Sequence, residues 1–184
     1  ARWLCFAALL CESTPPARAA ASEHHSLFID GEGRLSSCGC APHHAAGLLG
    51  HGEGVPRLNT PTRLPSTLGG ERAVSVSAGG FHSLAVTGSG SVWSWGSGDF
   101  GSLGHGDEQY QRRPRRIETL AGQRVVAVSA GDGHSLAVTA DGAVWSWGRE
   151  SDVPGQSVDP GGRRQIKKIE AAAGRGDGAG ATGG

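Results

Sequence analysis

Two segments of this chain are nearly identical, and their spacing limits the folds that the chain can adopt. Residues 72–96 and 124–148 share 18 of 25 aligned positions, without a gap and at an offset of 52 residues. A period of that length in a glycine-rich chain is typical of a repeat architecture. One repeat unit cannot bury its own apolar surface, so neighbouring units must pack against each other.

The repeat extends less clearly in both directions. Upstream, His25-Ser26-Leu27 corresponds to His82-Ser83-Leu84, and residues 47–52 correspond to residues 101–106. Downstream, residues 169–174 resemble the opening of the second clear copy, which indicates the start of another unit. The predicted repeat region is residues 18–170, with units at 18–71, 72–123, 124–165 and a partial unit at 166–178.

Each unit has the pattern of several short strands. Residues 74–78 alternate apolar and small polar side chains, and residues 82–87 end in β-branched side chains. Trp93 and Trp95 lie two positions apart in a third strand and therefore share a face. Pro114 indicates a fourth strand at an outer edge, where a missing N–H costs no ladder bond. We therefore predict an all-β fold, an incomplete β-propeller of about three four-stranded antiparallel blades plus a partial blade.

The repeated motif resembles a known family. The pattern A-G-x-x-H-S-L-A-V-T-x-x-G-x-V-x-x-W-G, followed by G-x-L-G-H-G, is similar to the regulator of chromosome condensation repeat. The resemblance covers roughly residues 18–178, and it implies a partial chain of a seven-bladed propeller. The kelch repeat has a similar period but carries a Gly-Gly doublet followed by spaced Tyr and Trp. In this chain the first copy has the doublet Gly79-Gly80, but the second copy has Gly131-Asp132 in its place, and Tyr110 is the only tyrosine. The sequence therefore favours the regulator of chromosome condensation repeat over the kelch repeat.

The two ends of the chain differ from the repeats. Residues 1–17 are expected to form an N-terminal extension; its apolar stretch fits a helix, an eroded strand or a clipped signal peptide. That stretch is too short to span a bilayer, so we expect no membrane partner. Residues 171–184 are rich in Gly and Ala, which predicts a flexible tail. Uncapped blades expose apolar faces, so the isolated chain is expected to self-associate.

Charge and cysteine usage argue against two classes of site. Lys plus Arg and Asp plus Glu both number 17, so the formal net charge is zero and nucleic-acid binding is not expected. Cys38 and Cys40, followed by His43 and His44, depart from the usual spacing of zinc ligands. Cys38 also occupies the position of a repeated tryptophan, which favours a core role. We expect no metal and no cofactor, and a cytoplasmic or nuclear location.

A histidine recurs in every unit, at His25, His82 and His134, each followed by a serine. A catalytic site is a single asymmetric arrangement, so residues that recur in each unit are more simply structural. We expect a ring nitrogen of each histidine to bond a backbone group beside the preceding glycine-rich break. Neighbouring residues of a strand point to opposite faces, which separates each histidine from its serine. We therefore predict no catalytic residue and no enzyme activity.

The repeated tryptophans allow one more interpretation. The plant ultraviolet-B photoreceptor, which resembles this family, absorbs light through clustered tryptophans and carries a G-W-R-H-T motif. This chain has Gly-Gly-Phe-His-Ser and Gly-Asp-Gly-His-Ser at the corresponding places, without that Trp or Arg. We therefore expect the tryptophans to pack between blades.

The predicted function is a protein-interaction platform within a larger signalling or regulatory protein, since loops on a rigid scaffold carry recognition. The resemblance implies two alternatives, which are guanine nucleotide exchange on a Ran-like small GTPase and substrate recognition in a HECT-type ubiquitin ligase. Exchange in this family depends on an inserted β-wedge loop, which this sequence does not show. The expected partners are proteins, a small GTPase among them. The candidate interaction residues are Asp99, Phe100, His105, Asp107, Tyr110, Arg112, Arg113, Arg115 and Arg116.

Overall fold

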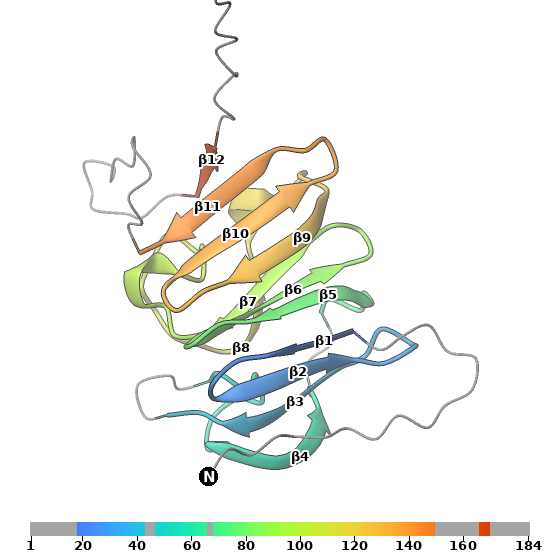
Figure 1. Ribbon diagram of the computed structural model, residues 1–184, viewed down its shortest axis with the longest axis vertical. Coiled ribbons are helices and arrows are strands. Elements are labelled where there is room, and N and C mark those ends of the chain that lie inside the picture. The colour runs from blue at the N-terminus through green and yellow to red at the C-terminus, as the bar shows by residue number, and fades with distance from the viewer. Residues whose placement is uncertain (1–17, 43–46, 66–67, 150–165, 170–184) are drawn as a thin grey trace, which may run out of the picture.

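Three stacked β-sheets make up the molecule (Figure 1). The computed structural model describes residues 18–42, 47–65, 68–149 and 166–169. Each sheet has four antiparallel strands, which confirms the predicted all-β propeller architecture. The predicted extension at residues 1–17 and the predicted tail at 171–184 lie outside the described residues.

Each sheet is one blade, and its strands follow the order of the chain. The first blade contains β1 (Arg18–Ala21), β2 (His25–Ile29), β3 (Leu35–Cys40) and β4 (Arg57–Arg63). The second contains β5 (Ala73–Ala78), β6 (His82–Thr87), β7 (Val92–Gly96) and β8 (Gln111–Arg116). The third contains β9 (Val125–Ala130), β10 (His134–Thr139), β11 (Val144–Gly148) and β12 (Lys167–Ile169). Two short 3-10 turns, η2 (Asp99–Gly101) and η3 (Glu118–Leu120), connect strands of the second and third blades.

The position of β12 corrects one predicted boundary. The sequence analysis assigned residues 166–178 to a further blade, because residues 169–174 resemble the first strand of a repeat. In the structure β12 pairs with β11, with Lys168 opposite Trp145, so it is the outer strand of the third blade. The three residues of β12 are too few for their apolar and polar pattern to distinguish the inner strand of a blade from the outer one. The pairing partner decides the assignment.

The strand β6 is buried along its whole length because both of its faces are covered. Leu84 and Val86 belong to the core shared with the third blade, and Ala85 belongs to the core shared with the first. The strand β10 has the same sequence, His-Ser-Leu-Ala-Val-Thr, but alternates between buried and more exposed residues. Within the described residues only one face of β10 is covered, so neighbouring blades decide how much of the sequence is buried.

The tryptophans fill the spaces between blades, as expected. Trp95 is fully buried in the first inter-blade core, and Trp147 takes the same place in the second. Val92 packs into the second core, on the opposite face of β7 from Trp95. Cys38 lies opposite Ser26 in the same register as Trp95 opposite Ser83, and it is buried. The structure thus confirms the interpretation of Cys38 as a core residue.

Gly96 ends β7 in a conformation that requires glycine, and we predict a large cost for changing it. Its φ is 104°, and an added Cβ would lie 2.6 Å from the Phe81 carbonyl oxygen. Gly96→Ala should therefore lower the free energy of unfolding by about 3 kcal/mol, measured by urea unfolding. Gly106 has a φ of 79° but open space around it, so Gly106→Ala should cost only about 1 kcal/mol. Equal losses in the two variants would contradict this account.

Candidate interaction surface

Histidines connect each blade to the next. The Nε2 atom of His25 in the first blade lies 2.7 Å from the Ser83 hydroxyl oxygen in the second. His82 and Ser135 repeat this contact between the second and third blades, again at 2.7 Å. The expectation that these rings bond a backbone group is therefore wrong. Each ring reaches a hydroxyl of the neighbouring blade, at a separation of more than 50 residues along the chain.

The hydrogen bonds around Ser83 determine the form of His25. The Ser83 hydroxyl donates to the Leu48 carbonyl at 3.2 Å, and the same carbonyl accepts the indole N–H of Trp95 at 3.1 Å. Since the hydroxyl has one hydrogen, the ring of His25 must donate to it from Nε2, which places a proton on that nitrogen. The next blade junction repeats the arrangement with His82, Ser135, Ser102 and Trp147.

The contacts of His25 resemble those of a hydrolytic triad but cannot act as one. Ser22 lies 2.9 Å from Nδ1 of His25, and Ser83 lies 2.7 Å from Nε2. However, His25 is 2% exposed and Ser83 is fully buried, so a substrate has no access. Burial lowers the pKa of His25 to about 3, with smaller contributions from His82 and His24, which makes it a weak base at neutral pH. These groups hold blades together.

A second histidine in each of the first two blades fixes a loop. His105 Nε2 lies 3.0 Å from the Ser94 hydroxyl oxygen, and that hydroxyl donates to the Leu103 carbonyl at 2.7 Å. Burial, with a smaller contribution from Arg115 and against an opposing effect of Asp107, lowers the pKa of His105 to about 4. The first blade repeats these contacts with Ser37, Leu49 and His51. His105, one of the candidate interaction residues, thus turns toward its own blade.

An aromatic patch lies at the end of β7, and we call Asp99, Phe100, Tyr110 and Arg149 the rim patch. Phe100 is 39% exposed and has a φ of 60°, the single positive φ of a non-glycine residue in the described part of the chain. The Arg149 guanidinium lies 4.9 Å from the centre of its ring. The Tyr110 hydroxyl donates to the Asp99 carboxylate at 3.3 Å, and Tyr110 is 41% exposed. Strained residues cluster at functional sites, which makes this patch a candidate.

The four arginines of the candidate set lie on the outer strand β8 instead. Arg112 forms an ion pair with Glu53 of the first blade at 2.9 Å, and Arg115 pairs with Asp107 at 3.7 Å. The structure thus divides the predicted residues between the rim patch, the loop at His105 and the outer strand. The sequence did not indicate the contacts of Arg149 and Glu53, because those contacts join different blades.

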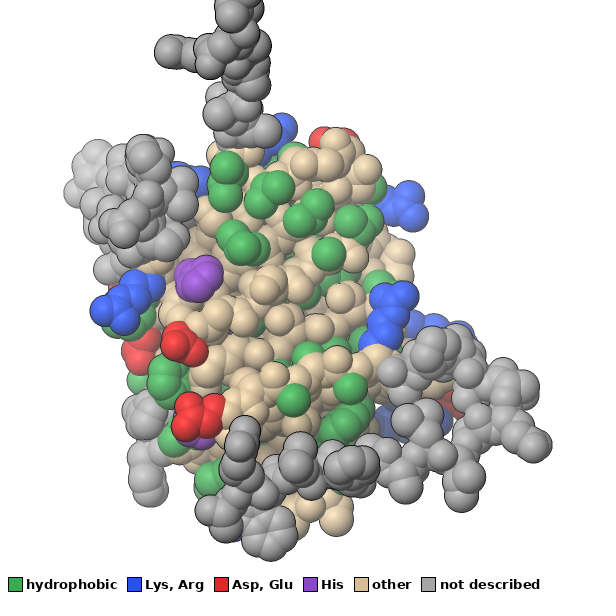
Figure 2. All heavy atoms as spheres, viewed as in Figure 1, with side chains coloured by type: hydrophobic (Ala, Val, Ile, Leu, Met, Phe, Trp, Pro, Cys, Tyr) green, Lys and Arg blue, Asp and Glu red, His purple; other side chains and the backbone are tan. Residues whose placement is uncertain are grey.

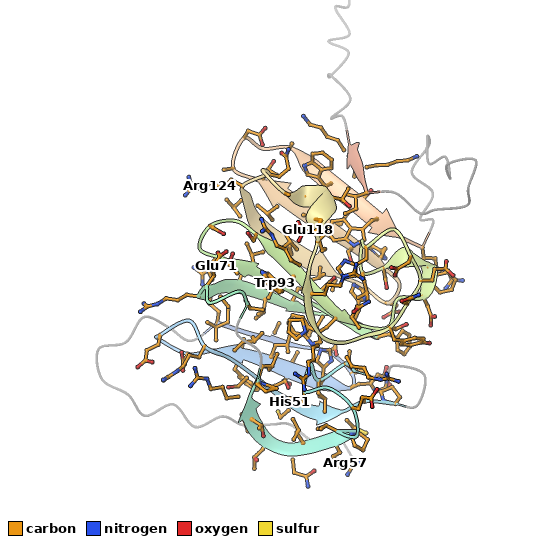
Figure 3. All side chains as sticks on the ribbon, turned by 180° about the vertical axis from the view of Figure 1, so that it is seen from behind. His51, Arg57, Glu71, Trp93, Glu118 and Arg124 are labelled. Carbon is orange, nitrogen blue, oxygen red and sulfur yellow. The ribbon has the colours of Figure 1, made fainter. Side chains whose placement is uncertain are left out.

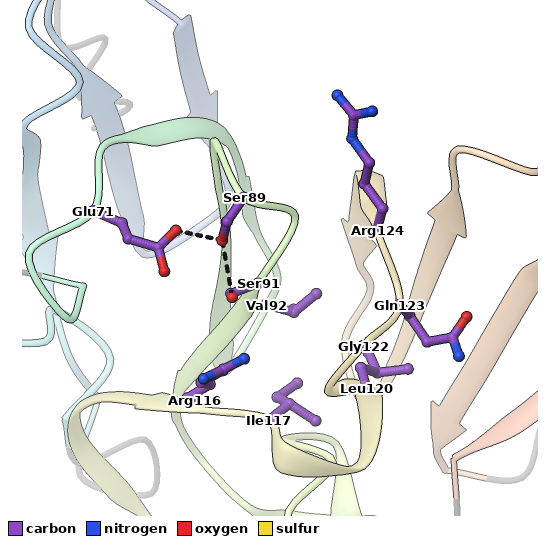
Figure 4. Close-up of a pocket in the computed structure, with 10 residues that line it drawn as sticks. All are labelled: Glu71, Ser89, Ser91, Val92, Arg116, Ile117, Leu120, Gly122, Gln123 and Arg124. Carbon is purple, nitrogen blue, oxygen red and sulfur yellow. Dashed lines mark hydrogen bonds between the residues drawn. The ribbon is translucent and has the colours of Figure 1, made fainter.

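Two hollows open on the surface. The larger, of about 880 Å³, follows β8, and we call it the β8 groove (Figure 3). Its walls are His51, Gly52, Glu53, Trp93, Tyr110, residues 111–116 and Glu118. The smaller, of about 330 Å³, lies between the second and third blades (Figure 4). There Ser89 donates to the Glu71 carboxylate, which lowers the pKa of that carboxyl group. This bond joins two turns, so the smaller hollow follows from turn packing.

The described part of the chain shows neither a membrane-spanning helix nor a cluster of metal ligands. No helix in residues 18–42, 47–65, 68–149 and 166–169 is long and apolar enough to cross a membrane. Over those ranges, no three His, Cys, Asp or Glu side chains lie close enough to hold a metal ion. His43 and His44, which follow the two cysteines in sequence, lie outside the described residues.

Comparison with known proteins places these blades in a family. The family described as Regulator of chromosome condensation (RCC1) repeat matches residues 32–86 and 89–138, more than half of the chain. This chain belongs to the RCC1 repeat family. It is 43% identical over 126 residues to the E3 ubiquitin-protein ligase HERC2 of Homo sapiens. That alignment covers 67% of this chain and 2% of HERC2. The chain is 47% identical over 107 residues to the ultraviolet-B receptor UVR8 of Arabidopsis thaliana, 58% of this chain and 24% of the receptor.

Solved structures of RCC1 propellers share the architecture. Prp20p of Saccharomyces cerevisiae superimposes with a TM-score of 0.67 at 23% identity, over 85% of this chain and 38% of Prp20p. This likeness shows the propeller fold alone. The RCC1-repeat chain spans less than half the length of each relative described here.

Proposed function

We propose that this chain is a protein-interaction platform that presents the rim patch to a protein partner. The observation that carries the proposal is Phe100, an exposed aromatic side chain with a left-handed backbone beside the exposed Tyr110. Aromatic and arginine side chains are enriched at the energetic centres of protein interfaces. The rim patch contains two aromatics and Arg149, whose guanidinium lies over one ring.

The scaffold below the patch supports this role. The rim patch lies on connections that leave buried strands, so a binding partner meets a surface that is already ordered. Arg149 holds Phe100, and Asp99 holds Tyr110, which reduces the side-chain entropy lost on binding. A pre-organised patch of this kind suits recognition of a folded protein or of an extended segment.

Proximity labelling in cells tests the rim patch. We expect Phe100→Ala and Tyr110→Ala to reduce the recovery of labelled partners by roughly fivefold to thirtyfold, because truncated anchors typically cost about 1–2 kcal/mol. Arg63→Ala is the control, since Arg63 is exposed and lies on β4, outside the patch. Equal recovery with the wild-type chain and the rim variants would contradict the proposal.

Substrate recognition in a HECT-type ubiquitin ligase is a second candidate function. The 43% identity to HERC2, an E3 ubiquitin-protein ligase, favours it. It predicts that partners lost in Phe100→Ala are also ubiquitylated less when that variant replaces the wild-type repeats. Guanine nucleotide exchange remains the other alternative, since Prp20p, described with its binding to Gsp1p and histones, shares the fold. Stimulated release of nucleotide from any of a panel of small GTPases would overturn the platform role.

Self-association of the isolated chain stays a prediction, and the third blade presents a surface that fits it. Figure 2 shows hydrophobic side chains gathered over this blade. On β9 to β11, Val126 is exposed, and Leu136, Val138 and Val144 are half-buried. The corresponding residues of the second blade are Val74, Leu84, Val86 and Val92, which contribute to the core shared with the third blade.

A further inference from the structure

The β8 groove carries an excess of positive charge. Its charged residues are four arginines and two glutamates, a net charge of +2 in a chain whose formal net charge is zero. Glu53 neutralises Arg112 at 2.9 Å. Arg113 and Arg116 form no ion pair with any described residue. These two guanidinium groups are exposed and available to a negatively charged partner.

The shape of the groove fits an extended peptide. The groove follows the six residues of β8, and an extended segment of that length spans about 20 Å. On one side, the Gly52 N–H donates to the Arg112 carbonyl at 2.8 Å, which fixes the first-blade loop against the strand. In Figure 3, Trp93 lies between His51 and Glu118, which both line the groove. The walls thus come from both of the first two blades.

A tryptophan in the wall has an unused donor. The indole Nε1 of Trp93 is buried and has no hydrogen-bond partner among the described residues. Buried polar groups are nearly always paired, so this N–H marks a place in the wall where the described residues supply no acceptor. Trp145 in the third blade shares the feature, but its neighbouring outer strand is the short β12. Only the second blade, in the described structure, combines this donor with four arginines on its outer strand.

We propose that the β8 groove binds an acidic peptide segment of a partner protein, at a surface separate from the rim-patch anchor Phe100. Arg113 and Arg116 would pair with its carboxylates, because a guanidinium and a carboxylate match in bidentate geometry. A nucleic acid fits less well, since its backbone needs a continuous basic surface. Here Glu53 and Glu118 interrupt that surface.

Fluorescence anisotropy with a labelled peptide of alternating Asp and Glu, about eight residues long, tests the proposal on the whole 184-residue chain. We expect the peptide to bind and to weaken at least about tenfold between about 50 mM and 500 mM NaCl, because exposed charges are screened. The double variant Arg113→Glu with Arg116→Glu should weaken binding by at least about tenfold at low salt. Near-ultraviolet circular dichroism confirms its fold, and Arg113→Gln with Arg116→Gln replaces it if it fails to fold.

The matched control is Arg57→Glu with Arg63→Glu, which makes the same charge change on β4, the outer strand of the first blade. It should change the affinity for the peptide by no more than about threefold. The altered charges on β4 lie away from the groove, so salt screens most of their effect on a peptide bound there. Phe100→Ala should leave peptide binding unchanged, which separates the groove from the Phe100 side of the rim patch, whereas Tyr110 borders both. The proposal is overturned if the wild-type chain does not bind the acidic peptide, or if the β8 and β4 double variants lose the same amount of affinity. It is also overturned if a peptide of Gln and Asn, or a single-stranded oligonucleotide, binds the chain as tightly as the acidic peptide does.

Discussion

Replacing Trp95 by alanine should lower the free energy of unfolding by about 3–5 kcal/mol, the range seen when a large aromatic side chain is removed from a core. Trp95 is fully buried between the first and second blades, among apolar side chains of both. The change also removes the indole N–H that the Leu48 carbonyl accepts. A loss of this size is a large part of the stability of a small domain, so unfolding in urea should begin at much lower concentration.

Two comparisons isolate the cause of that loss. Trp95→Phe keeps most of the apolar volume and removes the N–H, so it should cost about 1–2 kcal/mol. Trp145→Ala, at a half-buried position on the same face of the third blade, should cost less than Trp95→Ala. If Trp95→Ala unfolds in urea like the wild-type chain, the blades do not depend on this interface, and the stacked architecture would be refuted.

Acidification from pH 7 to pH 5 should cost about 4 kcal/mol of stability through His25 and His82, about 2 kcal/mol for each. The half-buried His105, whose pKa is also lowered, adds to that loss. Burial lowers the pKa of His25 to about 3 and that of His82 to about 4, from an ordinary value near 6.5. Both rings donate from Nε2, and Nδ1 of His82 is buried without a partner among the described residues, so a second proton there would be unsatisfied. The unfolded chain therefore binds more protons, and stability is lost as the pH falls from about 6.5 toward 4.

Urea unfolding at a series of pH values measures this effect. His82→Gln should reduce the slope of stability against pH by roughly a third, whatever its effect at pH 7, because His25 and His105 also have lowered pKa values. His134→Gln is the matched control, because His134 occupies the same position of the third blade but is exposed. It should retain the wild-type slope. Equal stability at pH 7 and pH 5, or an unchanged slope in His82→Gln, would show that the buried histidines do not set the acid sensitivity.

The strands could be predicted well from the sequence, because the two repeat copies share the same strand pattern and each supports the assignment made for the other. The alignment of residues 72–96 with 124–148 places the β-strands, and the alignment of the upstream copy with residues 82–96 gives Cys38 the position of Trp95 in the core. Periodicity within one copy is enough to assign the faces of β7, since the period of a strand is fixed at two residues.

The contacts between copies could not be predicted in the same way. Ser83 and His25 are 58 residues apart, and no local pattern says that a serine accepts from the histidine of the preceding blade. The candidate interaction residues also divide between the rim patch, the loop at His105 and the outer strand, because His105 bonds Ser94 while Arg113 lies on β8. Strand identity is a local property, whereas the orientation of loop side chains depends on which blade lies next to them.

The histidine–serine contact gives the stack a direction. A blade offers its histidine on one face and its serine on the other, so a unit of this type is complementary to a copy of itself in one orientation only. Duplication of a single repeat within the gene would therefore yield a new blade whose two faces already match both neighbours. This polarity explains how such arrays can lengthen by tandem copying without prior adaptation of either interface.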